Sequence, residues 1–300
     1  MPRPGRKLIE EGVRISDSLI FRQDKVWSRY SSDKVNIGET LARVIRTLQK
    51  YLPLDYELSA LSIGSSNEPQ FRILQSGFSA NLFLLDLEKD ALETVRERIR
   101  RQNTRNVCVI QGDYNRIFAS SKKAEEFREK RLLDKRMELI TLQHSLYYCR
   151  FDKWLDLLQR LCEQILARQG AMYMVLMSAR SDDPRTTTWL YNHFAGKFAG
   201  HQNDQCLRAF WSELVASPHF KAAEILHKTS HVEFFVEDFK KFMAVVWMIL
   251  LYPHVHTYTL EQRVEITEHA YENFFRKKQP LIQSQDHLVV YRGLEGPGLI

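Results

Sequence analysis

The chain has 300 residues, 44% of them hydrophobic, so it can bury the core of one large domain. Its 43 basic and 37 acidic residues give a net charge of +6, a mixed balance that does not by itself indicate a nucleic-acid partner. Its four cysteines form no C-x-x-C pair, which argues against a zinc site or a disulfide framework and favours a reducing cytoplasm. The longest apolar stretch, 242–252, is about half the roughly 20 residues that a membrane span needs, so no membrane partner is expected.

Helices and strands are expected to alternate along the first 180 residues. Helical spacing of apolar residues predicts a helix over 37–52, after an irregular segment over 1–30. The elements predicted next are a strand over 58–63, a short helix over 70–75, a strand from Asn81, a helix over 88–101, a third strand near 106–111 and a charged, solvated helix over 120–136. A fourth strand follows from Glu138, then a helix over 154–165 that Gly170 caps before the fifth strand.

The pattern of the last third is less regular. Aromatic residues scattered over 178–218 are typical of a lid or substrate wall. A β-like run over 231–235 precedes an apolar helix over 239–251, and Thr259 with Gln262 predicts a capping box for a helix that runs to Phe275. The final strand is predicted over 287–291. This alternation of strands and helices predicts an α/β fold.

Three apolar runs between 58 and 113 each end at a small or acidic residue. The first ends at Gly64, the second at Asp86, 22 residues later, and the third at Gly112 and Asp113. In an open parallel sheet the ligand binds beyond the carboxyl ends of the strands, with a tight turn after the first strand and an acid after the second that binds a ribose. The spacing therefore predicts a nucleotide-type pocket.

These motifs resemble those of the class I S-adenosylmethionine-dependent methyltransferases. Ser62-Ile63-Gly64 with Glu68, then Asp86, then Gly112-Asp113 are similar to the first three motifs of that class, and 138–149 and 170–177 are similar to its fourth and fifth strands. Among subfamilies the histamine N-methyltransferases are nearest, because they share Leu-Ser-Ile-Gly in the first motif and the Leu-Tyr-Tyr that stands here at 146–148. The family usually has more glycines where this chain has Ser65 to Pro69.

The resemblance covers most of the chain and implies S-adenosylmethionine as cofactor. It implies a three-layer, Rossmann-like, seven-stranded and mostly parallel sheet with an antiparallel last strand. It also implies one compact unit, made of a helical N-terminal cap over 1–55 and a methyltransferase domain over 56–300 with helical insertions, of which 181–220 is a candidate substrate lid.

The same resemblance implies roles for single residues. Gly64 would let the backbone approach the cofactor, Asp86 would accept hydrogen bonds from the ribose, and Asp113 would accept one from the adenine amino group. The remaining expected cofactor contacts are Ser62, Glu68, Gly112, Gln143 and, packed on the adenine ring, Leu87 or Tyr114. The structural alternatives are a turn glycine at 64, a helix cap at Asp86 and a loop cap at Asp113.

Candidate catalytic residues follow the fourth strand. His144 would orient or deprotonate an amine, and Tyr147 and Tyr148 would stack on a ring or enclose a cationic amine. The alternatives are a structural or surface histidine and tyrosines of a helix core, an interpretation favoured for Tyr148. By resemblance, Trp27, Tyr30, Gln283 and Ser284 are further candidates for the substrate wall.

The expected reaction is in-line transfer of a methyl group to a small molecule, an amine or an aromatic nitrogen, in which positioning contributes most. Methylation of RNA or protein is an alternative, motivated by basic residues in 96–105 and 122–136. Interleaved acids argue against it, as does the lack of an Asn/Asp-Pro-Pro-aromatic loop after the fourth strand. A non-catalytic binding protein with a methyltransferase-like fold is the third alternative, because the first motif is poor in glycine.

Overall fold

The computed structural model describes residues 4–17, 26, 33–53, 55–64, 74, 77–78, 80–251 and 258–294. The chain divides into two compact units. The first unit comprises 1–36, 177–206 and 229–285, and the second comprises 37–176, 207–228 and 286–300. Among the described residues, no helix combines the length and the apolar character needed to cross a membrane.

Seven strands form one sheet in the order β3-β2-β1-β4-β5-β7-β6. Their bounds are β1 (Ser59–Ile63), β2 (Asn81–Asp86), β3 (Val107–Gln111), β4 (Met137–Gln143), β5 (Leu166–Met177), β6 (Ala223–Phe234) and β7 (Leu281–Arg292). The pairs β1/β2, β1/β4, β2/β3 and β4/β5 are parallel, and the last strands are antiparallel. The expected mostly parallel α/β sheet is therefore confirmed.

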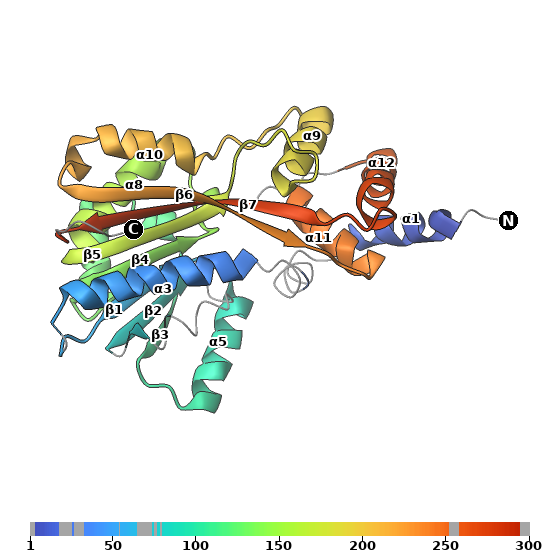
Figure 1. Ribbon diagram of the computed structural model, residues 1–300. Coiled ribbons are helices and arrows are strands. Elements are labelled where there is room, and N and C mark those ends of the chain that lie inside the picture. Colours follow the sequence, from blue (N-terminus) through green and yellow to red (C-terminus); the bar gives the residue numbers. More distant parts are fainter. Residues whose placement is uncertain are drawn as a thin grey trace. The chain divides into compact units, whose positions relative to one another are not determined.

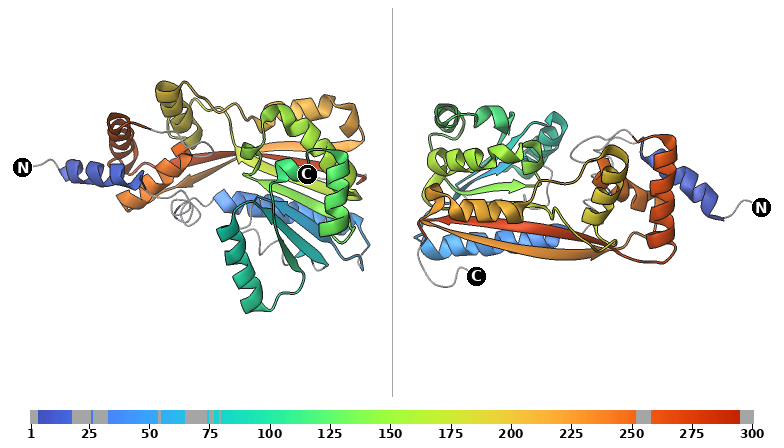
Figure 2. Two further views of the ribbon diagram at one scale, coloured as in Figure 1. Left: turned by 180° about the vertical axis from the view of Figure 1, so that it is seen from behind. Right: turned by 90° about the horizontal axis from the view of Figure 1, so that it is seen from above.

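The central strands are apolar because helices cover both faces of the sheet. Every residue of β1 and β4 is buried, which is the pattern of parallel strands between two layers of helices. In the second unit α3 (Asp33–Tyr51) lies along one face of the sheet, whereas α8 (Trp154–Arg160) and α10 (Leu207–Ala216) lie on the other (Figures 1 and 2). Leu41 of α3 packs in one cluster with Leu84 and Tyr173 of the sheet, and on the other side the rings of Trp154 and Phe210 are 5.3 Å apart.

The second unit also contains α5 (Lys89–Gln102), α6 (Tyr114–Ile117), α7 (Ser121–Arg131), the short helices η1 (Leu146–Tyr148), η2 (Phe151–Lys153) and η4 (Pro218–Phe220), and a short π-helix η3 (Leu161–Ile165) that continues α8. The predicted helices over 37–52, 88–101, 120–136 and 154–165 correspond to α3, α5, α7 and α8 with η3. The predicted helix over 70–75 lies mostly outside the described residues.

The first unit contains α1 (Pro4–Ile15), α9 (Thr187–Ala199), α11 (Phe239–Leu251), α12 (Leu260–Ala270) and the short π-helix η5 (Tyr271–Phe275). Trp247 of α11 is fully buried, and its indole donates to the carbonyl of Gly12 at 2.9 Å. Gly12 is needed there, because a Cβ would lie 2.6 Å from the Cγ2 of Thr267. The predicted capping box is confirmed, since Thr259 and Gln262 bond each other reciprocally at the start of α12.

Four sequence expectations about these elements were wrong. The segment 1–30, expected to be irregular, contains α1. The candidate lid over 181–220 contains α9 and α10, in which Phe194 and Phe210 are buried, and its role as a lid stays a prediction. Gly170 does not cap the helix, because the helix ends at Ile165 and Gly170 already lies in β5. The final strand begins at Leu281 rather than His287, and β6 is 12 residues long. Both were under-predicted because β6 is a half-exposed edge strand and β7 buries a polar run.

Candidate functional site

The carboxyl ends of the parallel strands are joined by backbone hydrogen bonds in the second unit. Gly64 donates its N–H to the carbonyl of Leu85 at 2.8 Å, and Gly112 donates to Asp86 at 2.9 Å. His144, just after β4, donates to Val175 of β5 at 2.9 Å. The residues that the sequence places after β1 to β4 therefore meet at one edge of the sheet, where a ligand of an open parallel sheet binds.

Gly64 has a backbone conformation that requires glycine. Its φ is +69°, and a Cβ at this position would lie 2.5 Å from the Cβ of Ser145. In the structure this glycine admits the segment after β4, and its expected role of letting the backbone approach a cofactor stays a prediction. Gly64 thus allows the end of β1 to contact the segment after β4 directly. This need for glycine is evident only from the folded chain.

Asp86 ends β2 with a partly exposed carboxylate. Its Oδ1 accepts a hydrogen bond from the N–H of Glu88 at 3.0 Å, while the N-cap of α5 is Glu88. Asp86 is therefore held in a turn but does not cap the helix, which removes the main structural alternative for this residue. Leu87 follows it with 61% of its surface exposed.

Asp113 and Tyr114 follow β3 and form a different arrangement. Asp113 caps α6 by accepting from Asn115 N–H at 2.9 Å and forms an ion pair with Arg116 at 3.4 Å, so the loop-capping role is present. Tyr114 is buried, and its hydroxyl donates to the carbonyl of Ser145 at 2.7 Å. Burial is the largest cause that raises the pKa of Tyr114. The exposed Leu87 is therefore better placed than Tyr114 to cover a ring.

The last residue of β4 and the segment after it include two buried polar atoms without a partner among the described residues. Gln143 Nε2 and Ser145 Oγ make no hydrogen bond in the part of the chain that the structure describes. A buried donor left unsatisfied costs about 1 to 3 kcal/mol, so such atoms are expected where a ligand completes the bonding. Ser62, by contrast, lies within β1 and accepts from the Thr141 hydroxyl at 3.1 Å, so it ties two strands together.

The candidate catalytic residues His144 and Tyr147 and the candidate substrate contact Tyr148 follow β4 directly. The His144 backbone has a φ of +53°, unusual for a residue with a side chain, and its ring stacks on Tyr147 with centroids 6.1 Å apart. Tyr147 is buried, whereas Tyr148 is 55% exposed, so the helix-core interpretation of Tyr148 was wrong. Asn115 fixes the turn by donating to the Tyr148 carbonyl at 2.9 Å.

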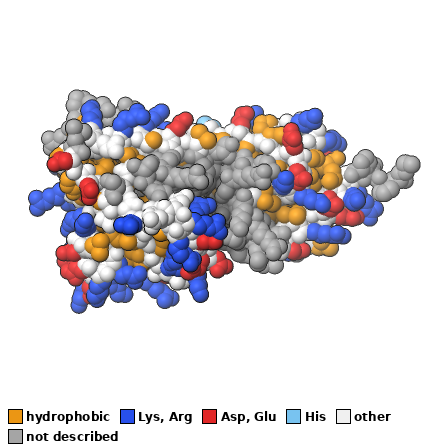
Figure 3. Space-filling view, turned by 90° about the horizontal axis from the view of Figure 1, so that it is seen from below, with side chains coloured by type: hydrophobic (Ala, Val, Ile, Leu, Met, Phe, Trp, Pro, Cys, Tyr) orange, Lys and Arg blue, Asp and Glu red, His pale blue; other side chains and the backbone are white. Residues whose placement is uncertain are grey.

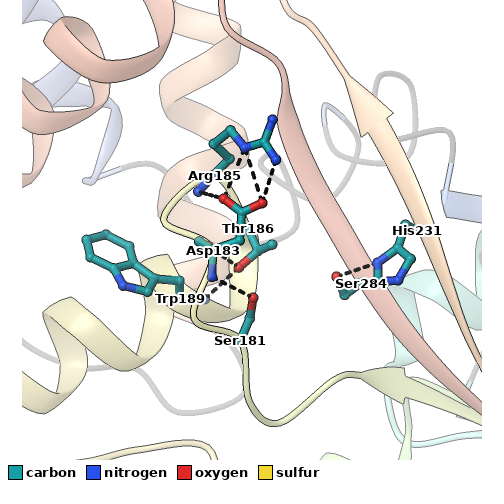
Figure 4. Close-up of polar contacts among 7 residues, drawn as sticks. All are labelled: Ser181, Asp183, Arg185, Thr186, Trp189, His231 and Ser284. Carbon is teal, nitrogen blue, oxygen red and sulfur yellow. Dashed lines mark hydrogen bonds and ion pairs between the residues drawn. The ribbon is translucent and has the colours of Figure 1, made fainter.

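Ser284 belongs to the first unit, where Figure 4 shows it beside His231. Its hydroxyl and the His231 Nδ1 are 2.9 Å apart. In the same figure Arg185 forms a bidentate pair with Asp183, and this pair lowers the pKa of the Asp183 carboxyl. Gln283 bonds Thr187 of the same unit at 2.5 Å. Glu68, Trp27 and Tyr30 lie outside the described residues.

Sequence reasoning missed a buried pair in the middle of the sheet. His287 of β7 lies 2.8 Å from the hydroxyl of Tyr173 on β5, and both side chains are buried in the second unit. Burial, assisted by the positive charges of Lys228 and His144, lowers the pKa of His287 to about 3. The available signal was the unbroken polar run 283–287, which cannot form an ordinary hydrophobic strand.

Comparison with known proteins supports the fold. No protein-family model matches the sequence, and no curated protein sequence matches it. The YcgJ protein from Bacillus subtilis has a similar structure, with a TM-score of 0.52, 13% identity, and coverage of 85% of this chain and 99% of that chain. The plantazolicin methyltransferase BamL, solved with a triazolic desmethyl plantazolicin analogue and SAH, gives a TM-score of 0.49 at 12% identity over 96% of this chain and 97% of that chain. At these identities the likeness shows the fold alone.

Proposed function

We propose that this chain is an S-adenosylmethionine-dependent methyltransferase that acts on a small molecule, an amine or an aromatic nitrogen. The observation that carries the proposal is the edge where β1 to β4 end. There Gly64 and Ser145 pack against each other, Asp86 ends β2 with a partly exposed carboxylate, and Gln143 holds an unsatisfied buried donor. Acceptors after the second strand and donors after the fourth fit a nucleoside with a charged amino-acid tail.

The residues divide into binding and positioning groups. Asp86 accepts hydrogen bonds from ribose hydroxyls, Leu87 covers the adenine, and Gln143 with Ser145 offers donors to the rest of the cofactor. Bound S-adenosylmethionine would supply a methyl group already activated on a sulfonium, so the protein needs no covalent residue. The task of the chain is to hold the acceptor in line and to exclude water, and such alignment lowers a barrier by up to about 7 to 11 kcal/mol.

The aromatic residues that follow β4 support an amine substrate. The Tyr148 side chain is largely exposed, and an aromatic face attracts an ammonium group by roughly 0.5 to 2 kcal/mol. We assign to His144, whose ring stacks on Tyr147, the role of orienting the amine or accepting its proton. The resemblance to histamine N-methyltransferases in the Leu-Ser-Ile-Gly and Leu-Tyr-Tyr segments supports the same class of substrate.

Surface charge favours a small molecule over RNA. On α5 Arg96 and Arg101 are paired with Glu93 and Glu97, and on α7 Lys130 lies 3.6 Å from Glu126. Among the described residues seen in Figure 3, acidic side chains lie between the basic ones. An RNA-binding face would need unpaired cations along the phosphate backbone and would show steep salt dependence.

The test is calorimetric titration of S-adenosylmethionine into the wild-type protein, Asp86→Ala and Asp90→Ala. Asp90 is an exposed acid in the first turn of α5, so its loss matches the change in charge without touching the site. Loss of the ribose acceptor should weaken binding roughly 10- to 100-fold, because hydrogen bonds to charged groups contribute about 1.5 to 3 kcal/mol. No binding by the wild type would exclude the enzyme, and equal affinities for the two variants would refute the ribose site.

A further inference from the structure

A second candidate site lies at the opposite, amino-terminal ends of the same strands. A cavity of about 800 Å³ opens there within the second unit, next to Ser59 at the start of β1 and Ala167 near the start of β5. Four cationic side chains line it, namely Lys135, Arg136, Arg168 and Arg292. We propose that this cavity binds a phosphorylated small molecule that also carries hydroxyl groups, a site distinct from the proposed methyl-donor site.

The cavity wall is built by an irregularity in the sheet. Met137 pairs with Leu166, but Leu139 pairs with Ala171, so Glu138 alone stands opposite the four residues 167–170. Such a bulge disrupts the ladder and re-aims side chains, and bulges are frequent beside binding sites. Here it brings Arg168, from the middle of the bulge, to the cavity wall.

The end of β7 adds a second guanidinium at the same place. Gly293, directly after Arg292, has a φ of +64°, and a Cβ there would lie 2.3 Å from the carbonyl oxygen of Arg168. Only glycine permits this close approach, so position 293 must be glycine for Arg292 to lie close to the bulge.

Two of the cations are anchored through the backbone. Nη1 of Arg136 donates to the carbonyls of Glu163 at 2.6 Å and Leu166 at 3.1 Å, and Nη1 of Arg292 donates to the carbonyl of Cys162. A guanidinium has five N–H donors, so each group keeps further donors after this anchoring. The side chains are therefore held in place before a ligand arrives, which reduces the entropy lost on binding.

Capping of the helix end explains part of this arrangement. Cations stabilise the carbonyls at a helix C-terminus, and Arg136 and Arg292 act in this way on η3. Capping does not explain Lys135 or Arg168. Across the described residues, Arg136, Arg168 and Arg292 form no ion pair with a carboxylate. Burial lowers the pKa of Arg136, and repulsion by the positive charges of Arg128, Arg292 and Arg168 lowers it further. A bound dianion would relieve this repulsion.

The other residues that line the cavity indicate which chemical groups the ligand carries besides its phosphate. Guanidinium groups bind phosphate bidentately through their planar fork. Glu57 and Glu163 also line the cavity, and carboxylates there would accept hydrogen bonds from hydroxyl groups of the ligand. The Tyr56 ring, 48% exposed, offers an apolar surface beside them. A phosphate ester of a hydroxylated small molecule satisfies all three features, whereas free phosphate uses the cations alone.

The experiment is calorimetric titration with inorganic phosphate and with ribose 5-phosphate at constant ionic strength. The proteins are the wild type, Arg168→Gln, Lys135→Gln and the control Arg98→Gln, whose exposed residue on α5 does not line the cavity. The ester should bind more tightly than phosphate. Arg168→Gln and Lys135→Gln should weaken both ligands roughly 5- to 30-fold, because each removes a charge-assisted contact, while Arg98→Gln should leave them unchanged.

Three outcomes would contradict the proposal. Absence of binding to the wild type, or an equal loss in Arg98→Gln, would overturn it, and equal affinity for phosphate and the ester would overturn the ester assignment. Since Arg168 and Lys135 are exposed side chains, their variants should fold, and thermal unfolding of each variant verifies this. S-adenosylmethionine binding by Arg168→Gln should match the wild type, so failure of this proposal is separable from failure of the proposed enzyme.

Discussion

The two ends of the parallel strands in the second unit differ in geometry and in charge. At the carboxyl ends the backbone is closely packed, with Gly64 against Ser145, and the acid Asp86 ends β2 while Asp113 follows β3. At the amino ends the β4/β5 ladder opens into a bulge, and cations such as Arg168 line a cavity. The carboxyl edge thus combines acidic side chains with a tightly packed backbone, whereas at the amino edge four cationic side chains line an open space.

Helix ends account for much of this difference. Helices begin near the carboxyl ends of the strands and finish near the amino ends, so acceptors are favoured at the first edge and cations at the second. Asp113 capping α6 and Arg136 bonding the carbonyls of η3 both follow this rule. The informative residues are those that this rule does not explain, because Asp86 caps no helix and Arg168 forms no ion pair in the described part of the chain. These residues carry the two ligand proposals.

The largest loss of stability should come from adding a methyl group at the carboxyl edge with Gly64→Ala. The new Cβ would clash with Ser145 at 2.5 Å and the residue would be strained at a φ of +69°. Left-handed strain of about 1 to 2 kcal/mol and overpacking of about 1 to 3 kcal/mol predict a loss of roughly 2 to 5 kcal/mol in the free energy of unfolding, measured in urea.

Gly200→Ala separates the two causes of that loss. Gly200 has a similar φ of +63° but nothing within 4 Å of its added Cβ, so only the strain should remain. If both variants lose the same free energy, the contact with Ser145 is not what requires glycine at 64. The tight frame inferred for the carboxyl edge would then be wrong.

Substitution of Glu138, a buried residue that lines the cavity, tests the amino edge. The Glu138 carboxylate accepts from Ser59 N–H at 2.7 Å and from the Tyr56 hydroxyl at 2.9 Å. Glu138→Ala leaves the buried N–H unsatisfied and should cost about 2 to 3 kcal/mol in urea unfolding, whereas Tyr56→Phe should cost at most about 1 kcal/mol. Equal losses would show that the backbone bond to β1 contributes nothing.

Much of this frame could be predicted from the sequence. The strands β1 and β2 were placed within one residue, because each is an uninterrupted apolar run that stops at Gly64 or Asp86. The positions of the site residues followed from those strand ends. The reason for Gly64 did not, because its contact with Ser145 joins segments about 80 residues apart and no local pattern reports it.

The amino edge and the last strand were less predictable for a physical reason. Gly170 has the position of a helix-capping glycine, yet it lies in a bulge whose register is set by pairing with β4. The run Gln283 to His287 has the polarity of a loop, yet it is buried in β7. Polar residues can occupy a buried strand when distant partners satisfy them, as Thr187 does for Gln283 and Tyr173 does for His287.

The smallest predicted effect concerns His287, which lies on the sheet between the two edges. Burial lowers its pKa to about 3, and the positive charges of Lys228, His144 and His227 act in the same direction. The negative charge of Asp286 opposes them. The unfolded chain therefore binds a proton that the folded chain excludes, and stability is lost as pH falls below the ordinary histidine pKa of about 6.5. One pH unit below that value the loss attributable to His287 should be about 1.4 kcal/mol.

Urea unfolding at pH 7.5 and 5.5 measures this loss in the wild type, in His287→Gln and in His219→Gln. His219 is an exposed histidine on η4, so its variant controls for the removal of one imidazole. The difference between the two pH values should shrink in His287→Gln and remain in His219→Gln. An unchanged difference in His287→Gln would mean that the imidazole is not held neutral between the edges, and Tyr173 would then be paired with a charged ring rather than a neutral one.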